Sequence, residues 1–431
     1  MDRDLGVDVL IIGGGIQALY LARSLHPRYS VGIVADPTRP SEALDATGLF
    51  SAGYDGNDAV RIQPARRSAG YWRQWAEANG VRHDLAPTLF VTSADDAADR
   101  LRLWADATLV AGPADALPAP LVGGTLALDH AFVVPNDLVM NPAEVVDRLR
   151  SGLEHRFVWG EVTKFGLITD QDIEFVEVQT ADGTLVPITP RFVVLADDVH
   201  NGALLQRLVA SFKDRAKRRE ATDTMRSCQA VRRRTTIVIR GDLEPVAGSF
   251  GGLEIVAHPS RSGGELVWLV SPAIDDRQTV LGPEDARFAP AVDAALVRRA
   301  IDTLLEISPA IAERAEDLEW AVYVARKTEH PMMAAADTSN LAQPAPARIE
   351  SLDMDSFLAV WPSHLGYSMI VGDVVAERID VALGGSTAVA EGLQPSDVPG
   401  EAIDPVARWE RDDLVWNDWS TFTSVHGIVT P

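Results

Sequence analysis

The chain opens with an apolar run that ends in three glycines and passes at once into a helical pattern. Residues 7–12 are mostly apolar, which predicts a buried strand. Leu19, Ala22 and Leu25 then recur at the spacing of one helix face. A second apolar run, 31–35, follows after a short polar stretch. The pattern therefore predicts a strand–helix–strand unit at the start of the chain.

Beyond this unit, helical and strand-like stretches succeed one another up to residue 383. The predicted helices cover residues 59–79, 143–150, 203–219, 292–307 and 366–383. The predicted strands cover residues 88–92, 156–159, 161–168, 173–180, 184–188, 191–195, 235–240, 253–258, 265–270 and 356–361. Residues 41–56 and 331–347 are predicted loops. The run that ends at Leu195 is continuously apolar, which indicates a buried parallel strand.

The glycines have the spacing of a dinucleotide-binding corner. Gly13 permits a tight turn, Gly15 lets a pyrophosphate approach the backbone, and Ala18 is small enough for the helix to pack on the strand. The start of the helix offers unpaired N–H groups and a partial positive charge to phosphates. Asp36 follows the second strand about 20 residues on, where such motifs carry an acidic residue. A chance glycine-rich turn is the alternative. The predicted cofactor-binding residues of this corner are Gly13, Gly15, Ile16, Gln17, Ala18 and Asp36.

Length and composition indicate a folded chain of at least two domains. The 431 residues exceed one comfortable core, and 46% of them are hydrophobic. Asp and Glu outnumber Lys and Arg by 62 to 39, which gives a net charge of −23. Such a field repels nucleic acid and anionic membranes, so neither is expected as a partner. The basic runs 213–219 and 232–234 are interpreted as solvated faces of a helix or strand.

The cysteine count and the N-terminal sequence limit which sites the protein can hold and where it is expected to be located. Cys228 is the single cysteine, so an intramolecular disulfide and a cysteine-rich metal site are excluded, and no metal site is expected. The first strand begins too early for a secretory leader, and no apolar run reaches the ~18 residues of a membrane span. These observations favour a cytoplasmic protein.

In this order the segments resemble the D-amino-acid-oxidase-like superfamily of FAD-dependent oxidoreductases, which includes glycine oxidase and sarcosine oxidase. The resemblance covers roughly residues 5–383. It is carried by the Gly13/Gly15/Ala18 turn and by the segments 46–54, 65–72, 133–136, 161–162 and 361–369. It implies bound FAD, with further cofactor contacts at Gly48, Ser51, Ala52, Val162, Gly366, Tyr367 and Ser368.

The resemblance also implies the domain organisation. The expected fold class is α/β, with a discontinuous Rossmann-like FAD-binding domain and an α+β substrate domain built on an antiparallel sheet. The FAD-binding domain is expected to comprise residues 1–85, 135–220 and 310–385, and the substrate domain residues 86–134 and 221–309. The tail, 386–431, is acidic and carries Trp409, Trp416 and Trp419. It is interpreted as packing on the body, or alternatively as contacting a second subunit in a homodimer.

Several residues depart from the family pattern. Ala35 stands where relatives end the second strand with Glu, and Asp36 lies one residue later. Asp197 and Asp198 replace the usual Ala-Gly after the strand that ends at Leu195. The last loop keeps Gly366 but lacks another usual glycine. These departures predict that FAD is held less tightly than in typical members.

The resemblance implies that a hydride equivalent passes from a C–N bond to the flavin, while protein groups orient the amine. Arg326 is the candidate anchor for a substrate carboxylate, or else forms a surface salt bridge. His364 is the candidate titratable group beside the flavin, or else a histidine satisfied by its loop. Tyr54 is the third candidate catalytic residue, or else a core aromatic.

The expected function is oxidation of a small amine or amino acid by an FAD-dependent oxidoreductase. The segment 263–268 has no Lys of the kind that promotes oxygen reaction in relatives, so the electron acceptor stays open. One alternative is an FAD-dependent monooxygenase, although Gly372-Asp373 falls inside a predicted helix rather than at a flavin contact. The other is a degenerate flavin-fold binding protein without catalysis.

Overall fold

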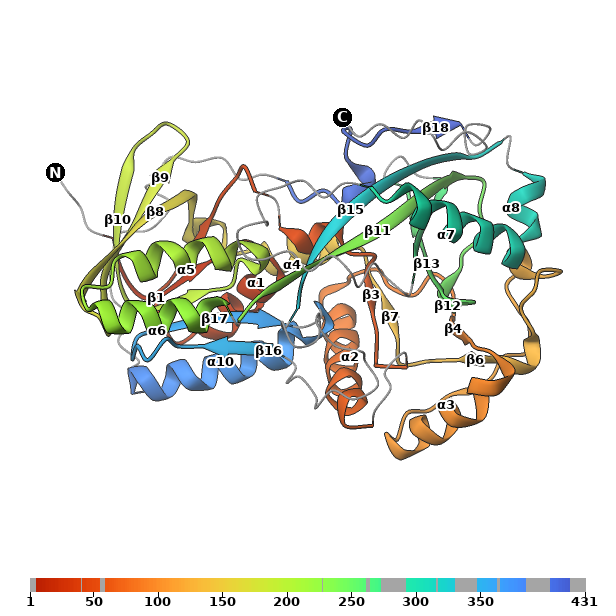
Figure 1. Cartoon of the computed structure of the whole chain (residues 1–431), viewed down its shortest axis with the longest axis horizontal. Coiled ribbons are helices and arrows are strands. Elements are labelled where there is room, and N and C mark those ends of the chain that lie inside the picture. Colours follow the sequence, from red (N-terminus) through yellow and green to blue (C-terminus); the bar gives the residue numbers. More distant parts are fainter. Residues whose placement is uncertain are drawn as a thin grey trace.

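Two β-sheets lie side by side in the computed structural model, with a long helix between them (Figure 1). The structure describes residues 5–39, 41–54, 59–226, 228–260, 264–272, 292–314, 317–329, 347–362, 365–384 and 404–418. One sheet has seven strands and the other nine, and a further pair of short strands lies between them. This arrangement gives the mixed α/β architecture that the sequence predicts.

The seven-stranded sheet contains the glycine-ended strand. Its members are β1 (Leu5–Ile12), β2 (Val31–Ala35), β8 (Phe157–Thr169), β9 (Asp172–Thr180), β10 (Leu185–Leu195), β16 (Ala347–Glu350) and β17 (Phe357–Pro362). β1 pairs in parallel with β2 and β10, β2 with β8, and β10 with β17. The carboxyl ends of these parallel strands therefore meet at one edge, which is where open α/β sheets bind ligands.

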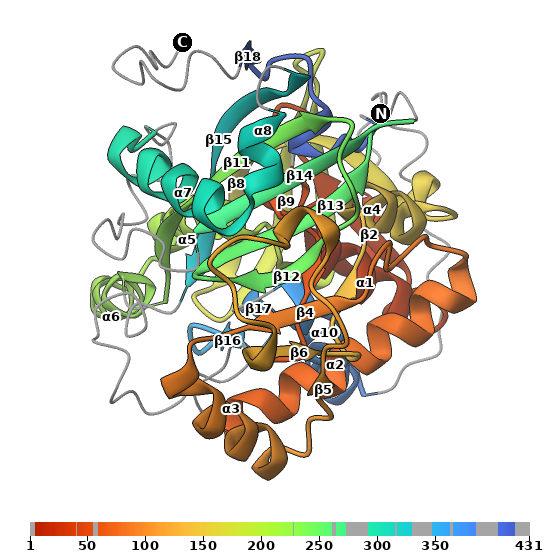
Figure 2. The ribbon, with the colours of Figure 1, turned by 90° about the vertical axis from the view of Figure 1, so that its right-hand side faces the viewer.

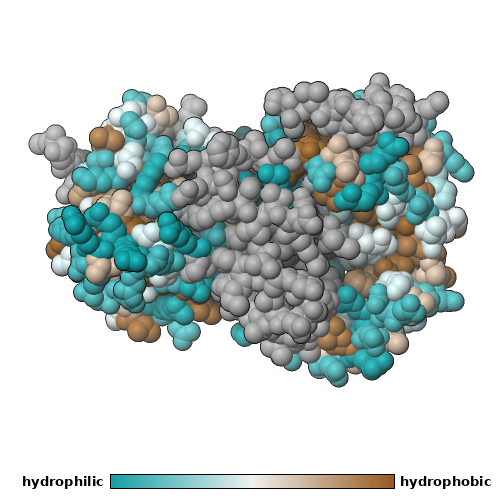
Figure 3. Space-filling model, viewed as in Figure 1, coloured by the Kyte–Doolittle hydropathy of each residue, from teal (hydrophilic) through white to brown (hydrophobic). Residues whose placement is uncertain are grey.

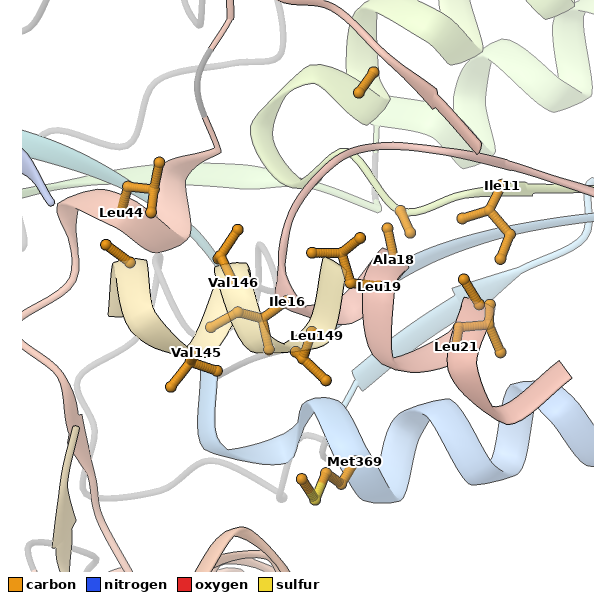
Figure 4. Packing of buried hydrophobic residues seen from close by; sticks show 14 of the residues in the cluster. Ile11, Ile16, Ala18, Leu19, Leu21, Leu44, Val145, Val146, Leu149 and Met369 are labelled. Atoms are coloured by element: carbon orange, nitrogen blue, oxygen red, sulfur yellow. The ribbon is translucent and has the colours of Figure 1, made fainter. Parts of the chain in front are cut away.

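Helices cover both faces of this sheet. They are α1 (Ile16–Leu25), α4 (Pro142–Arg150), α5 (Asn201–Ala210), α6 (Arg215–Arg226) and α10 (Ser368–Leu383). Val9 and Ile11 of β1 pack in the cluster that includes α1, α4 and α10, whereas Leu10 and Ile12 pack in the cluster that includes α5 and α6. Figure 4 shows part of the first cluster. Successive side chains of a strand point to opposite faces of the sheet. The apolar residues of β1 therefore contribute to the hydrophobic core on each face.

The nine-stranded sheet is antiparallel except for the β4–β12 pair (Figure 2). Its strands are β4 (Thr88–Val91), β5 (Gly112–Pro113), β6 (Ala131–Val133), β11 (Ala230–Gly241), β12 (Ala247–Phe250), β13 (Leu253–Pro259), β14 (Leu266–Pro272), β15 (Glu319–Glu329) and β18 (Asn417–Asp418). The helices that accompany it are α3 (Ala94–Asp106), α7 (Ala294–Ile307) and α8 (Pro309–Glu313). Val297, Ile301 and Leu304 of α7 are buried against this sheet, which closes the second core.

α2 (Ala59–Asn79), β3 (Leu49–Phe50) and β7 (Leu138–Val139) lie between the two sheets. Trp72 of α2 is fully buried, and its indole N–H donates to the carbonyl of Gly366, 2.9 Å away. Phe50 packs on the same ring at a centroid separation of 4.9 Å. The short 3-10 helices are η1 (Glu42–Asp45), η2 (Ala119–Leu121), η3 (Leu128–His130), η4 (Glu154–Arg156), η5 (Asp198–His200), η8 (Leu365–Tyr367) and η10 (Arg408–Glu410).

Most predicted elements are confirmed, but the predicted helix 203–219 and part of the predicted loop 41–56 differ in the structure. The bounds of α2 agree with the predicted helix 59–79, and the predicted helix over 143–150 is α4 with Pro142 added at its start. The predicted helix 203–219 is instead two helices, α5 and α6. The Asp170 carboxylate accepts from the N–H groups of Lys213 and Asp214 at 2.7 and 2.8 Å. These bonds hold the chain in a turn that the helical periodicity does not reveal.

Two pairs of predicted strands are continuous. The stretches 156–159 and 161–168 form one strand, β8, and the stretches 184–188 and 191–195 form β10. Leu185–Ile188 pair antiparallel with β9, whereas Leu5–Ile12 of β1 pair in parallel with residues 188–195. One strand therefore takes part in both kinds of pairing.

Residues 404–418, here called the C-terminal segment, pack on the body of the protein. Trp409 is 3% exposed, and its ring stacks on His258 with 4.8 Å between centroids. Trp416 lies under the Arg240 guanidinium, 3.9 Å away, and β18 pairs with Glu319 and Trp320 of β15. These contacts agree with a tail that packs on its own chain. Trp419 lies outside the described residues.

The surface agrees with the interpretation of the basic run 213–219. Figure 3 shows hydrophilic colours over the region of α5 and α6. Arg215, Lys217 and Arg218 belong to α6, whose side chains in this stretch are largely exposed. Within the described ranges, no helix combines the length and the apolar character needed to cross a bilayer.

Candidate active site

The glycine corner has the backbone geometry that the motif predicts. Gly13 follows β1 with a φ of +136°, and a Cβ there would lie 2.3 Å from the carbonyl oxygen of Ala196. Only glycine fits this close approach of β1 to the chain that follows β10. Gly15 caps α1 without a side chain, while Ile16 and Ala18 are buried in the adjoining core. The corner therefore presents the start of α1 toward the edge where the parallel strands end.

The space above this corner is nearly filled. A Cβ on Gly15 would lie 2.6 Å from the hydroxyl oxygen of Ser41. The cavity that remains measures about 40 Å³, against the 300–1,000 Å³ typical of ligand pockets. It is lined by Gly15, Ile16, Gln17, Ser41, Glu42, Ala43, Ala196, Asp197, Asp198, His200, Val360, Pro362, Leu365 and Ser368. In this conformation it has room for water and not for a diphosphate.

Carboxyl groups dominate the polar lining of this cavity. Glu42 is 8% exposed and forms an ion pair with Arg326 of β15 at 2.5 Å. Burial raises the pKa of Glu42, and the nearby charges of Asp45 and Asp198 raise it further against the effect of Arg326. Burial, reinforced by Asp198, raises the pKa of Asp197 to about 7. Such shifts are typical of carboxyl groups packed together without enough positive charge.

The two aspartates replace small residues at the end of β10. Asp198 adopts a left-handed backbone with a φ of +49° and accepts a hydrogen bond from the hydroxyl of Thr328. The Asn201 side chain accepts from the N–H of Asp197 at 2.9 Å. Burial also raises the pKa of Asp198. The neighbouring His200 has its pKa lowered to about 4 by burial and by Arg326, so it adds no positive charge at neutral pH.

A larger cavity, of about 440 Å³, opens beside the end of β2. Gly14, Asp36, Arg39 and Trp159 contribute to its wall, together with residues 404–412 of the C-terminal segment. The Asp36 carboxylate accepts from the N–H and the hydroxyl of Thr38 at 2.9 and 2.7 Å and pairs with Arg39 at 3.2 Å. Asp36, a predicted cofactor-binding residue, therefore lines a cavity of ligand size.

The predicted cofactor contact at Val162 of β8 is engaged with protein groups. The carbonyl of Val162 accepts a hydrogen bond from Arg207. Glu161 pairs with the same Arg207 and with Arg39. The hydrogen bond from Arg207 holds the pKa of Glu161 below its usual range.

The segment predicted to run beside the flavin is packed tightly. Gly48 has a φ of +82°, and a Cβ there would lie 2.2 Å from the carbonyl oxygen of Met140. The Ser51 hydroxyl accepts from the N–H of Gly53 at 3.0 Å, and the N–H of Ala52 donates to Asp137 at 2.6 Å. These bonds fix the backbone of the segment.

His258 of β13 packs against the same segment. Its Nε2 lies 2.7 Å from the carbonyl oxygen of Thr47, and burial lowers its pKa to about 4. A neutral His258 donates to this carbonyl through Nε2. With Trp409 stacked on its other side, the ring joins the second sheet to the C-terminal segment.

The last loop places its three predicted residues at the start of α10. The carbonyl of Gly366 accepts hydrogen bonds from the Ser68 hydroxyl and from Trp72. Tyr367 precedes the first residue of α10, and the Ser368 hydroxyl donates to Leu365 at 2.9 Å. Ser368 lines the 40 Å³ cavity, so this loop does reach the glycine corner.

Of the three predicted catalytic residues, the structure describes Arg326 and Tyr54, and it places these two in different surroundings. Arg326 lies beside the corner and is paired with Glu42. Tyr54 is 1% exposed, donates to the carbonyl of Val110 at 2.6 Å, and packs edge-on against Trp104. Burial raises the pKa of Tyr54 to about 12. His364 lies outside the described residues.

Sequence reasoning missed the residues that close the corner. The Asp45 carboxylate forms an ion pair with Arg411 at 3.3 Å, and its backbone carbonyl accepts from the Tyr323 hydroxyl at 3.1 Å. Residues 42–45 were predicted as loop and form η1. Ser41 could have revealed this turn, because its hydroxyl accepts from the N–H of Ala43 as a helix cap does.

Residues 8–345 match the family model described as DAO, FAD dependent oxidoreductase. The chain belongs to this family of FAD-dependent oxidoreductases. The match spans most of the chain, so this oxidoreductase is an enzyme of that class, and FAD is the cofactor of its family. A search of curated proteins with this sequence returns no match.

Solved structures show the same fold as the oxidoreductase. An FAD dependent oxidoreductase from Pseudomonas aeruginosa is 20% identical, with 95% of this chain and 98% of that chain covered and a TM-score of 0.62. L-amino acid deaminase from Proteus vulgaris is 16% identical, with coverages of 89% and 91% and a TM-score of 0.62. Glycine oxidase from Geobacillus kaustophilus is 17% identical, with coverages of 88% and 95% and a TM-score of 0.60.

The main chain of the corner has the shape that FAD requires. The side chains around it, with their carboxyl groups, do not suit an ionised diphosphate. The close approach at Gly13 and the bare start of α1 provide the cradle, and the 440 Å³ cavity beside Asp36 suits an adenosine group. The Ser41 hydroxyl lies over Gly15, however, and Glu42 and Asp197 bring carboxyl groups to the lining of the 40 Å³ cavity at this corner. The described residues hold no group of three or more His, Cys, Asp or Glu side chains placed to bind a metal ion.

Proposed function

We propose that this oxidoreductase oxidises the C–N bond of a small amine or amino acid. The observation that carries the proposal is the corner at Gly13 and Gly15, which faces the edge where the parallel strands of a DAO-family sheet end. Two structures that share the fold, glycine oxidase and L-amino acid deaminase, are named for amino-acid substrates. The monooxygenase alternative gains no support from Gly372, which lies in the middle of α10 against Tyr20.

The residues proposed to hold FAD form a row that would run from the adenosine end of the cofactor to its flavin. The cavity beside Asp36 and Trp159 would take the adenosine half, with Val162 on the neighbouring strand. The start of α1 would meet the diphosphate. The flavin would lie toward the second sheet, near the segment 48–52 and the loop 366–368. When bound, FAD supplies the acceptor for a hydride equivalent. The protein supplies the positions of the groups around it.

Arg326 is the proposed anchor for a substrate carboxylate. It lies on β15 of the second sheet and points its guanidinium at Glu42 of η1, so it stands at the boundary between the two sheets. A guanidinium can hold a carboxylate through two parallel hydrogen bonds. Glu42 now takes that place, and a substrate carboxylate would compete with it. A neutral Glu42 would compete less.

The experiment is a substrate panel under anaerobic conditions with the protein loaded with FAD. Glycine, D- and L-amino acids, N-methylated amino acids and simple amines are added in turn, and bleaching of the flavin absorbance is followed. Bleaching by an amine supports the proposal. A flavin that no amine bleaches, in a protein that oxidises NADPH with saturation, would favour the monooxygenase. Arg326→Lys should raise the KM for a carboxylate-bearing amine about tenfold or more while changing KM for a simple amine little.

A further inference from the structure

The acidic lining of the glycine corner opposes the charge that the family's cofactor brings. A diphosphate diester carries two negative charges at neutral pH, and the start of a helix offers only a partial positive charge to it. Glu42 and Asp197 both line the cavity directly over Gly15. Ionised carboxylates there repel the diphosphate at short range, in a site that water screens poorly.

The charged groups around these two carboxyls come from five parts of the chain. They are Asp36 and Arg39 after β2, Asp45 of η1, the segment with Asp198 and His200 after β10, Arg326 and Lys327 of β15, and Arg408, Arg411 and Asp413 of the C-terminal segment. Most of the positively charged side chains in this set already form ion pairs. Arg326 pairs with Glu42, Arg411 with Asp45, and Arg39 with Asp36 and Glu161. The corner therefore has little positive charge left to offset a diphosphate.

An independent observation indicates that this acidic cavity is built for a polar ligand. Gln17 on the first turn of α1 is 6% exposed and lines the cavity. In the part of the chain that the structure describes, neither its amide nitrogen nor its amide oxygen has a hydrogen-bond partner. A buried amide without partners costs stability, so it is expected to bind something in the working protein. Its NH₂ group can donate to a phosphate oxygen, or to a carboxyl that the phosphate displaces.

The turn that carries Glu42 is fixed to the core rather than loose. Leu44 of η1 is buried in one cluster with Ile16 of α1 and Val146 of α4, which Figure 4 shows close together. Because the backbone of the turn is anchored by this packing, the room that the 40 Å³ cavity lacks must come from rotation of side chains such as Ser41 and Glu42, and Glu42 stays near a bound diphosphate. The least costly arrangement there has a neutral Glu42 carboxyl, since a neutral carboxyl can donate a hydrogen bond to a phosphate oxygen.

We propose that Glu42 and Asp197 determine how tightly this chain holds the FAD diphosphate, and that the diphosphate binds together with protons taken up by these two carboxyl groups. The inference rests on FAD being the cofactor of the proposed function. No covalent bond changes in this step. Each proton comes from solvent and ends on a carboxyl oxygen of Glu42 or Asp197.

The expected pH dependence follows from linkage. In the FAD-free protein the pKa of Asp197 is about 7, and that of Glu42 is also raised. Below these values the carboxyls are already neutral, so the Kd for FAD is constant. Above them each proton that must be taken up weakens binding by about tenfold per pH unit. Affinity is therefore lost as the pH rises through neutrality, and kept as it falls.

The test is calorimetric titration of FAD into the FAD-free full chain between about pH 6 and pH 8.5, in two buffers of different ionisation enthalpy, which reports proton uptake directly. ADP-ribose, which carries the same diphosphate without flavin, serves as a second probe. Glu42→Gln and Asp197→Asn each remove one carboxyl at nearly constant volume. Asp302→Asn is the matched control, because it removes one charge from the exposed face of α7. Circular dichroism checks that each variant is folded.

We expect uptake of about one proton or more per FAD or ADP-ribose above neutral pH, and a Kd that rises about tenfold per pH unit per proton. At about pH 8, Asp197→Asn should bind about tenfold more tightly, and Glu42→Gln about twofold more tightly because the pKa of Glu42 is about 8, each with correspondingly less proton uptake. Asp302→Asn should behave as the wild type does.

The inference is overturned by a Kd that does not change with pH, by folded variants that bind no better than the wild type, by a control variant that tightens binding equally, or by the absence of binding in all of these proteins at every pH. Its failure is separable from that of the proposed function. Flavin bleaching by an amine without proton-coupled binding leaves the function standing alone. Proton-coupled binding in a protein that no amine reduces leaves this inference standing alone.

Discussion

At the scale of single residues, Asp197 links the chemistry of the corner to the stability of the fold. Its pKa is raised in the folded protein, so the folded state holds this proton more tightly than the unfolded chain does. The stability that the proton contributes is complete below the ordinary carboxyl pKa. It is lost progressively as the pH rises to about 7.

Asp197→Asn should therefore be more stable than the wild type above neutral pH. We expect the free energy of unfolding to rise by about 1 kcal/mol at about pH 8, and the gain to shrink toward about pH 4. Partial exposure of the side chain and screening by solvent keep this gain below the free energy that corresponds to the whole pKa shift. Urea denaturation at both pH values measures the gain, with Asp302→Asn as the control. A variant that is less stable than the wild type at the higher pH would contradict the raised pKa of Asp197, because the backbone N–H of residue 197 that donates to Asn201 is kept in the variant.

Sequence reasoning reached some of these residues and could not reach others. Asp197 and Asp198 were recognised as departures because they stand in a motif whose neighbours are fixed by spacing. Glu42 does not stand in a motif of this kind. Its burial depends on Arg326, which lies far away in the sequence and meets it only because β15 reaches the corner from the other sheet. A pairing of this kind leaves no local pattern in a single sequence.

At the scale of elements, the C-terminal segment holds parts of the chain that are distant in sequence. Trp409 stacks on His258 of β13, and Arg411 pairs with Asp45 of η1. The segment thus contacts both the second sheet and the turn over the glycine corner. The sequence indicated that the tryptophans pack somewhere, because three of them in an acidic stretch would be costly to expose. The partners of Trp409 and Trp416 became evident only in the structure.

Trp409→Ala should destabilise the protein by about 3 kcal/mol, because the indole is almost fully buried and its removal leaves a cavity. Trp416→Ala is the matched control, with an expected loss of about 1 kcal/mol, since that ring is only partly buried, at the border of the core and under the Arg240 guanidinium. Thermal and urea denaturation measure both. Equal losses in the two variants would contradict the view that Trp409 is the main anchor of the segment.

Element boundaries were predictable where the signals are local. α4 begins after Asn141, whose side chain accepts from the N–H of Ala143, and this cap stands in the sequence as Asn-Pro. The break between α5 and α6 was not predictable, because it depends on Asp170 at the far end of β8. Tertiary contacts override helical periodicity in such cases.

At the scale of the whole molecule, the net charge of −23 makes self-repulsion a property of the fold. Raising NaCl from about 0.01 M to 0.15 M shortens the screening length from about 30 Å to about 8 Å. We expect the Tm to rise by about 2–4 °C over this range. KCl at the same concentrations is the control for a specific effect of sodium. A Tm that falls would mean that surface pairs such as Arg28–Asp380 contribute more than the repulsion costs.

The overall architecture was the most predictable part of the molecule. Strand and helix periods are set by which faces are buried, and each core imposes its pattern on the sequence that builds it. The continuously apolar runs within β1 and β10 therefore indicate a buried parallel sheet, whereas the antiparallel sheet was expected from the family resemblance. How side chains from the two sheets meet at the corner is a matter of packing between distant segments, which periodicity does not encode.

β18 protects one end of β15, where it pairs with Glu319 and Trp320. A reading frame stopped after residue 403 would produce a protein that lacks both this short strand and the Trp409 anchor. The outer border of the nine-stranded sheet would then offer unpaired amide and carbonyl groups to any other chain. Self-association during expression is the consequence to expect from such a shortened product.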